Sequence, residues 1–272
     1  MYPSLEILDI GCDDSSELQG FLNDLYLYKH DVTTKIYHRS RIALFLRLLR
    51  QLIADETIRK FDRALDIGCN AGFYAKVISD CGFRDVYGVD INDAYVAKAN
   101  QNFYSDCPGK SVRFETGDAA TISRNKYYDF ILCTEVIEHT EDPEAVIDTI
   151  MALLAPGGIA VISLPNRLSL GYSTAYVAAL AKRRGIRKEL LDHLKYPAYR
   201  GPQLFKHKGA RILRTSGVNF LFNDPLVRLL HRAPFFDVLN RINFWASKRF
   251  PLKWLAQFFF FVVKKEASGN FA

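Results

Sequence analysis

Two hydrophobic periodicities divide the chain. Residues 1–61 carry the spacing of helices, and within them Arg41–Ile53 places Arg47 and Arg50 on one side and a broad apolar face on the other. From residue 62 onward, short β-rich runs alternate with helix-length stretches, and several of these runs are continuously apolar. Continuous apolar strands are typical of a parallel sheet that is covered on both faces. The pattern therefore predicts a helical N-terminal extension followed by a doubly wound α/β fold with a mostly parallel, Rossmann-like sheet.

The pattern predicts seven strands, and four helices accompany them. The strands are expected at Ala64–Gly68, Asp85–Asp90, Ser111–Glu115, Tyr128–Thr134, Gly158–Leu164, Val218–Phe222 and Phe258–Val263. The helices are expected at about Gly72–Cys81, Asn92–Tyr104, Pro143–Leu154 and His207–Thr215. Residues 62–165 then form the core. Residues 166–272 complete the sheet and carry two basic, aromatic insertions, 166–204 and 223–254, which we expect to form a substrate lid.

Composition narrows the class of protein. The chain has 272 residues, 49% of them hydrophobic and 24% charged, which excludes a disordered, collagen-like or disulfide-stapled chain. No run reaches the ~18 apolar residues that a spanning helix requires. The amino terminus lacks the basic and apolar regions of a signal peptide. The five cysteines form no CxxC pair, which favours reduced thiols and a cytoplasmic protein.

Charge is unevenly distributed along the chain. Residues 166–272 carry 20 Lys and Arg against 5 Asp and Glu, a net charge of +15, so the first 165 residues carry −9. This asymmetry predicts that the C-terminal part meets an anionic partner: a phosphate-bearing substrate, a membrane surface or a nucleic acid. A solvated basic surface is the simpler alternative for any single cluster.

A glycine turn is the most informative segment. The run Ala64-Leu-Asp-Ile-Gly68-Cys-Asn-Ala-Gly72 leads from a strand through two glycines into a helix, which lets backbone N–H groups approach a ligand closely. The next strand ends in Asp90, 22 residues after Gly68. In doubly wound folds an acid at this offset accepts hydrogen bonds from ribose hydroxyls. The segment therefore predicts a nucleotide site.

The glycine pattern disfavours a dinucleotide. The G-x-G-x-x-G fingerprint would place glycines where this chain has Gly68, Asn70 and Phe73, so two of three are missing. There is also no Walker A lysine. A ligand other than NAD or ATP is indicated.

Four segments together resemble class I S-adenosylmethionine (SAM)-dependent methyltransferases. They are Leu65–Gly72, Val89-Asp90, Gly117-Asp118-Ala119 and Ala155–Gly158, in order and at suitable spacing across residues 62–165. The resemblance implies that Gly68 and Gly72 pass the methionine part, that Asp66 orients the turn and that Asp90 holds the ribose. It also implies that Asp118 meets the adenine amino group. The implied cofactor-binding set is Asp66, Gly68, Cys69, Asn70, Gly72, Asp90, Ile91, Asp118, Ala119 and Thr134.

An acidic and histidine-containing cluster follows the fourth predicted strand. In Thr134-Glu135-Val-Ile-Glu138-His139, a helical turn would place Glu135, Glu138 and His139 on one face. Such a set can bind Mg²⁺ or another divalent ion. Alternatively, His139 is a general base with Glu138 as its orienting partner. The third reading is that these residues only position the helix.

This cluster resembles the E-x-x-E-H segment of the ubiquinone-biosynthesis O-methyltransferases and, more loosely, of small-RNA 3′-end methyltransferases. The resemblance implies Glu135, Glu138 and His139 as metal ligands, with a fourth downstream for which His193 is favoured over His207. The C-terminal third matches these families poorly, so the acceptor does not carry over from them; we expect methyl transfer to an oxygen of a small or lipid-like acceptor. The alternative is a basic membrane- or RNA-binding protein with the same fold. Interleaved charge and aromatics around Lys182–Lys188 and Phe244–Trp254 suit peripheral membrane contact, and no nucleic-acid motif is present.

Overall fold

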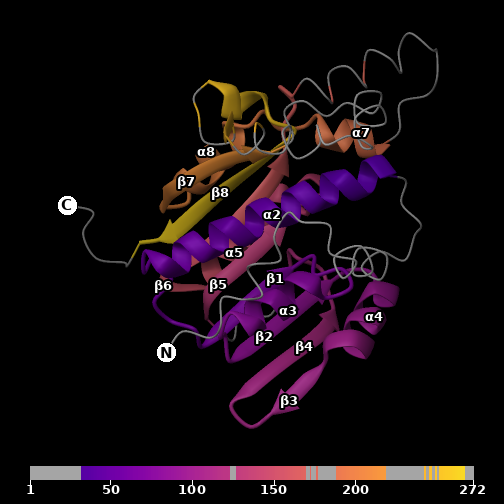
Figure 1. The fold of residues 1–272 in the computed structure, drawn as a ribbon, viewed down its shortest axis with the longest axis vertical. Coiled ribbons are helices and arrows are strands. Elements are labelled where there is room, and N and C mark those ends of the chain that lie inside the picture. Colours follow the sequence, from indigo (N-terminus) through magenta and orange to yellow (C-terminus); the bar gives the residue numbers. More distant parts are fainter. Residues whose placement is uncertain are drawn as a thin grey trace.

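The computed structural model describes residues 32–122, 127–169, 188–218 and 251–266, with six single positions between them (Tyr172, Tyr176, Ile242, Trp245, Ala246 and Arg249). Its centre is one eight-stranded sheet in the order β3-β4-β2-β1-β5-β6-β8-β7 (Figure 1). The strands are β1 (Arg63–Ile67), β2 (Asp85–Asp90), β3 (Ser105–Cys107), β4 (Lys110–Thr116), β5 (Tyr128–Thr134), β6 (Leu154–Pro165), β7 (Ala210–Val218) and β8 (Phe258–Lys265).

The five central strands run parallel. β4, β2, β1, β5 and β6 pair in parallel, whereas β3 on β4 and β8 between β6 and β7 are antiparallel. The chain crosses from β1 to β2 on one side and returns to β5 on the other, so the strand order reverses at β1. The prediction of a doubly wound, mostly parallel sheet is confirmed. Ligands in such sheets bind outside the carboxyl ends of the strands at this reversal.

Helices cover both faces of the sheet, because successive residues of a strand point to opposite faces. Ala64 of β1 belongs to the apolar cluster under α2 (Val32–Ala54), α3 (Phe73–Asp80) and α4 (Asp93–Phe103). Leu65 belongs to the cluster on the other face, under α5 (Pro143–Leu153) and α8 (Arg200–Lys206). Figure 1 shows α2 lying across the sheet, with Leu49 and Leu52 fully buried. The described part of the N-terminal extension therefore belongs to the core.

Three short helical elements complete the described fold, and two of them lie near the carboxyl ends of β5 and β6. A 3₁₀ turn, η2 (Ile137–His139), follows β5, and α7 (Lys188–His193) belongs to the first predicted insertion. A second 3₁₀ turn, η3 (Leu252–Leu255), precedes β8. The lid remains a prediction, since most of residues 170–187 and 219–250 lie outside the described part.

Two details of the predicted fold are wrong. The sheet has eight strands rather than seven, because Ser105–Cys107 folds back on β4 across a turn at Gly109. No helix forms at His207–Thr215. Helix α8 ends at Lys206, because Gly209 takes a left-handed φ of 77° and residues Ala210–Val218 form β7, which pairs with β8. The strand expected at Val218–Phe222 thus begins eight residues earlier, and residues 219–222 lie outside the described part.

Two findings bear on the class of protein. The four described cysteines, Cys69, Cys81, Cys107 and Cys133, are free thiols, while Cys12 lies outside the described part. Among the described residues, no helix has the length and apolar content that crossing a bilayer requires.

Candidate functional site

The predicted site residues lie along the carboxyl edge of the parallel strands. The glycine turn follows β1, Asp90 ends β2, Asp118 follows β4, and Thr134 ends β5. The site therefore has two sides that meet at the reversal point of the sheet. The nucleotide side consists of the ends of β1, β2 and β4, and the acceptor side consists of the ends of β5 and β6 with η2 and α7.

The glycine turn is fixed by backbone geometry. Gly68 has a φ of 73°, and its N–H donates to the carbonyl of Val89 at 2.7 Å. A Cβ on Gly68 would lie 2.2 Å from Cγ2 of Val136. Gly72 has a φ of 90°, and a Cβ there would meet Phe114 at 2.8 Å and Ala99 at 3.0 Å. Neither position accommodates a side chain, which keeps the backbone open to a ligand.

Asn70 stands where the dinucleotide fingerprint has a glycine, and it adopts a backbone conformation that glycine favours. Its φ is 49°, in the left-handed region that asparagine tolerates better than most residues. Its side-chain Oδ1 accepts the N–H of Ala71 at 2.7 Å, and its own N–H donates to Oδ2 of Asp90 at 2.9 Å. The turn is thereby tied to the acid that ends β2.

Two acids on the nucleotide side differ in environment. Asp90 accepts the N–H groups of Asn70 and Asn92, both at 2.9 Å, and is half-buried, so its oxygens keep lone pairs toward the crevice. Asp66 is fully buried in β1. Burial and the negative charge of Asp90 raise the pKa of Asp66 to about 8, although the backbone N–H of Ala75 partly offsets this. At neutral pH Asp66 is therefore largely protonated in the free protein.

The remaining cofactor candidates vary in exposure. Ile91 is 76% exposed directly beside Asp90, whereas Cys69 is buried. Asp118 is exposed, and its Oδ1 accepts the N–H of Ala120 at 2.8 Å. A cavity of about 640 Å³ lies beside Asp118 and extends along the sheet face to Tyr87. The edge thus offers carboxylate acceptors and an exposed apolar side chain, and the cavity beside Asp118 lies on the adjoining sheet face.

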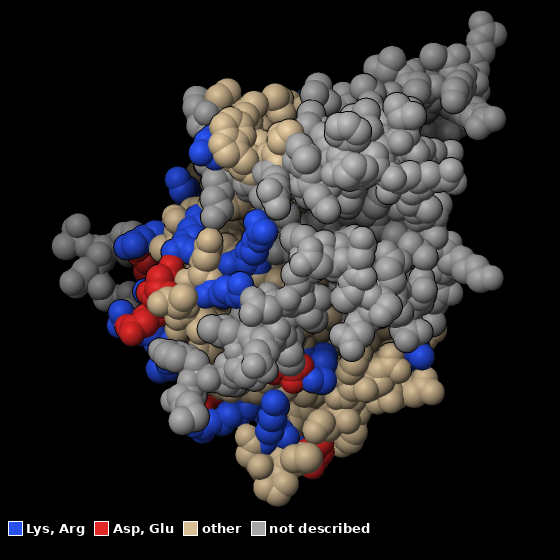
Figure 2. All heavy atoms as spheres, in the orientation of Figure 1, with Lys and Arg blue, Asp and Glu red and all other residues tan. Residues whose placement is uncertain are grey.

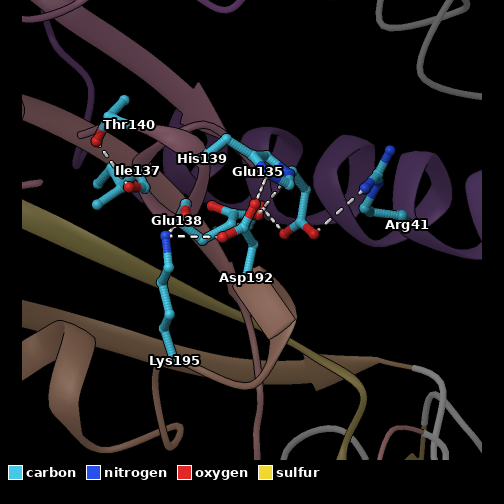
Figure 3. A network of polar contacts seen from close by, with 9 residues as sticks. Arg41, Glu135, Ile137, Glu138, His139, Thr140, Asp192 and Lys195 are labelled. Carbon is cyan, nitrogen blue, oxygen red and sulfur yellow. Dashed lines mark hydrogen bonds and ion pairs between the residues drawn. The ribbon is translucent and has the colours of Figure 1, made fainter. Parts of the chain in front are cut away.

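On the acceptor side, the three residues of the Glu-Glu-His cluster are not on one helical face. Glu135 precedes η2 with a left-handed φ of 55°, and only Glu138 and His139 lie in the 3₁₀ turn. Oε1 of Glu135 accepts the hydroxyl of Ser163 at 2.8 Å, and Oε2 lies 3.7 Å from a guanidinium nitrogen of Arg41. Arg41 of α2 and Ser163 of β6 thus hold the carboxylate of Glu135, and Figure 3 shows the contact with Arg41.

Glu138 and His139 have contrasting surroundings. Glu138 is fully buried, and neither of its carboxyl oxygens has a hydrogen-bond partner among the described residues. Burial and the charge of Glu135 raise its pKa well above the ordinary value of 4.5. The side chain of His139 is 42% exposed, and its Nε2 lies 3.7 Å from Oε1 of Glu138. An accessible imidazole therefore lies beside a buried carboxyl group whose pKa is raised.

Sequence reasoning missed two residues of this site. Asp192 and Lys195, on and just after α7, lie against η2: Oδ2 of Asp192 is 3.4 Å from Nδ1 of His139, and Nζ of Lys195 is 2.8 Å from Oδ1 of Asp192. Lys195 also donates to the backbone carbonyl of Glu138 at 2.6 Å. Sequence reasoning singled out only the adjacent His193, whose side chain lies outside the described part.

The described residues do not form a metal-ligand set. Among them, no three His, Cys, Asp or Glu side chains come together in an arrangement that could hold an ion. Glu135 faces Arg41, and Asp192 faces Lys195, so protein cations occupy two of the carboxylates. Metal binding by Glu135, Glu138, His139 and His193 stays a prediction.

Comparison with protein families finds a match over most of the chain. The sequence model of a family described as "Methyltransferase domain" matches residues 37–235. Among curated proteins, the chain is 29% identical over 136 residues to the ubiquinone biosynthesis O-methyltransferase of Psychrobacter arcticus, covering 49% of this chain and 52% of that protein. It is also 29% identical over 168 residues to the enzyme of the same name from Paraburkholderia phymatum, covering 61% and 70% of the two chains. The chain thus spans only about half the length of the first of these relatives.

Solved structures share the fold at low identity. Magnesium protoporphyrin IX methyltransferase from Synechocystis PCC 6803, solved with bound S-adenosylhomocysteine, has a TM-score of 0.58 and 16% identity, covering 93% of this chain and 95% of that chain. A methyltransferase from Clostridium acetobutylicum has a TM-score of 0.50 and 13% identity, covering 81% and 89%. The chain therefore shares the fold of these methyltransferases.

Proposed function

This chain belongs to the methyltransferase domain family, and on that premise we propose that it transfers a methyl group from SAM to an oxygen of a small or lipid-like phenolic acceptor. The observation that carries the proposal is the meeting of two features at one edge of the sheet: the glycine turn with Asp90, and the accessible imidazole of His139. The names of the curated relatives support oxygen as the methylated atom.

The nucleotide side suits the chemistry of SAM. The cofactor carries two ribose hydroxyls, an exocyclic amine and a sulfonium cation. Asp90 and Asp118 are carboxylates that accept from such donors. Gly68 and Gly72 lack the Cβ atoms that would narrow the turn. Exposed Ile91 offers an apolar surface to the adenine ring.

The acceptor side suits proton removal. Methyl transfer is a displacement at the methyl carbon, and holding the nucleophilic oxygen in line with carbon and sulfur supplies much of the rate. A phenolic hydroxyl with a pKa near ~10 needs a base to become a nucleophile at neutral pH. In this proposal Nε2 of His139 accepts that proton. Burial raises the pKa of Glu138, which favours the uncharged form of this carboxyl group beside the ring.

Isotope transfer tests the reaction itself. SAM with a labelled methyl group is incubated with the protein and catechol as the probe acceptor, and the product is examined by mass spectrometry and NMR. We expect the label on oxygen, and we expect NAD not to compete with SAM in calorimetry. Label on carbon or nitrogen across a panel of phenols, anilines and enolisable acceptors would replace the oxygen assignment. Failure to bind SAM would reject the proposal.

A second element of the proposal is contact with an anionic membrane. Figure 2 shows Lys and Arg side chains gathered over α2 and the ends of β7 and β8. A cavity of about 560 Å³ in this region is lined by five basic residues, Arg59, Lys60, Arg211, Arg214 and Lys264, against three acidic ones, Asp55, Glu56 and Asp129. The C-terminal part also exposes Trp245 by 53%, with Arg249 stacked on its ring at 4.1 Å. Aromatic and basic side chains together suit the membrane interface.

Vesicle sedimentation tests this contact. We propose that the protein binds vesicles of phosphatidylserine and phosphatidylcholine and that Trp245→Ser weakens binding several-fold. Tyr104→Ser is the matched control, because Tyr104 is similarly exposed, by 55%, after α4. Equal loss in both variants would indicate a nonspecific effect. Binding to RNA but not to vesicles would favour the nucleic-acid alternative.

A further inference from the structure

Helix α7 and turn η2 are joined by a network that no motif in the sequence announces. Lys195 bridges them, with Nζ 2.8 Å from Asp192 of α7 and 2.6 Å from the carbonyl oxygen of Glu138 in η2. Asp192 is only 6% exposed, and its second oxygen lies 3.4 Å from Nδ1 of His139 (Figure 3). The carboxylate is therefore fixed on one oxygen by a cation and aimed at the imidazole with the other.

The charge state of this carboxylate determines the tautomer of the ring. The hydrogen bond from Lys195 holds the pKa of Asp192 below its ordinary value, so the carboxylate is ionised and can only accept. In a neutral imidazole one nitrogen carries the proton and the other keeps a lone pair. Contact with an acceptor at Nδ1 requires the proton there, which leaves the lone pair on Nε2.

Glu138 does not compete for this role. Its Oε1 is 3.7 Å from Nε2, longer than a hydrogen bond, and its pKa is raised by burial. The two acids next to His139 thus differ: Glu138 is fully buried and lies near Nε2, whereas Asp192 is paired with Lys195 and lies near Nδ1. The orienting partner comes from the inserted segment and not from the motif that contains the histidine.

We propose that Asp192, anchored by Lys195, is the positioning residue that holds His139 in the Nδ1-protonated tautomer with Nε2 directed to the acceptor. This inference rests on the proposed function, in which Nε2 takes the acceptor proton. It also assigns a role to the first insertion, because α7 completes the acceptor side by packing on η2. An imidazole held by a carboxylate in this way avoids spending part of its time in the unproductive tautomer.

The tautomer can be observed without any acceptor. Long-range ¹H–¹⁵N NMR of ¹⁵N-histidine-labelled protein, treated with a chelator and measured at about pH 8.5 where imidazoles are neutral, reports which nitrogen carries the proton. His139→Gln identifies the signal. We expect Nδ1–H in the wild type and a mixture in Asp192→Asn. Asp148→Asn is the matched control, since Asp148 also pairs with a lysine, Lys208 at 2.7 Å, but has no histidine partner among the described residues.

Kinetics with catechol separate the inference from the function on which it rests. We expect Asp192→Asn to lower kcat about a hundredfold with the KM for SAM unchanged, Asp192→Glu to restore part of kcat, and Lys195→Met to have a smaller effect than Asp192→Asn. If His139→Ala retains activity, the proposed base fails. If His139 is essential but Asp192→Asn keeps both the wild-type tautomer and the wild-type kcat, the positioning role is wrong while the function stands. An Nε2–H tautomer in the wild type would overturn the inference whatever the kinetics.

Discussion

The two sides of the site are built by different means. On the nucleotide side, the turn after β1 is held mainly by backbone groups: Gly68 donates to the carbonyl of Val89, and Asn70 donates to Asp90. On the acceptor side, charged side chains hold one another, as Asp192 does with Lys195. Each side also contains one buried acid with a raised pKa, Asp66 and Glu138. The comparison teaches that the proposed cofactor side is built from a fixed backbone and the proposed catalytic side from a network of side chains.

The largest expected effect separates the two sides by function. His139→Ala should lower kcat by about 10²–10⁴, the range attributed to a general base. The dissociation constant for SAM should stay within about twofold, because His139 belongs to η2 and not to the glycine turn. Turnover of catechol and calorimetry with SAM measure the two quantities. A folded His139→Ala protein that turns over at the wild-type rate would mean that the acceptor side only supports the fold.

The junction of the two sides gives the next largest effect. Gly68→Ala should destabilise the protein by about 2–4 kcal/mol, because it combines a left-handed backbone with overlap against Val136 of the acceptor side. Gly157→Ala is the matched control: its φ is 77°, but a Cβ there meets nothing within 4 Å. It should cost only about 1–2 kcal/mol. Urea unfolding of both variants checks this, and equal losses would show that backbone strain alone accounts for the effect.

The same contrast explains what the sequence predicted and what it did not. The nucleotide side was predictable because Gly68, Asn70 and Asp90 lie within one strand–helix–strand unit, where spacing fixes geometry. Asn70 takes the place of a glycine of the dinucleotide fingerprint, and its φ of 49° shows that the turn keeps a left-handed backbone there. The start of β7 in the antiparallel part of the sheet was predicted inaccurately, because it depends on the left-handed backbone of Gly209 and on pairing with β8.

The acceptor side was only half predictable for a physical reason. The motif named Glu135, Glu138 and His139, but their partners come from α2 and α7, distant in the sequence, and no local spacing signals such contacts. The sequence therefore predicted His193 as the fourth ligand, whereas Asp192, one residue before it, is the side chain that lies beside His139. The role of a charged residue in an inserted segment depends on tertiary contacts, so it can be recognised only when the fold shows that the segment lies at the site.

A smaller effect tests the cofactor contacts. Asp90→Ala should weaken SAM binding about 10–100-fold, because two hydrogen bonds to a charged group contribute roughly 1.5–3 kcal/mol each and water replaces part of that. kcat at saturating SAM should change much less than in His139→Ala. Calorimetry with SAM and with its demethylated product measures the loss. Asp93→Ala, which removes the exposed acid at the start of α4, is the control and should bind as the wild type does.

The last expected effect is on the pH dependence of stability, through the buried acid of the nucleotide side. Folding raises the pKa of Asp66 from 3.8 to about 8, so between these values the folded protein holds a proton that the unfolded chain has lost. Stability from this group is therefore greatest below about pH 4 and is lost as the pH rises to about 8. Asp66→Asn mimics the protonated acid and does not titrate. We expect the difference in Tm between Asp66→Asn and the wild type to grow in favour of the variant from about pH 4 and to level off above about pH 8, with each ~1 kcal/mol equal to roughly 2–4 °C. Differential scanning fluorimetry of the free proteins across this range measures it. A difference that is constant with pH would mean that Asp66 is ionised throughout this range and that burial does not raise its pKa.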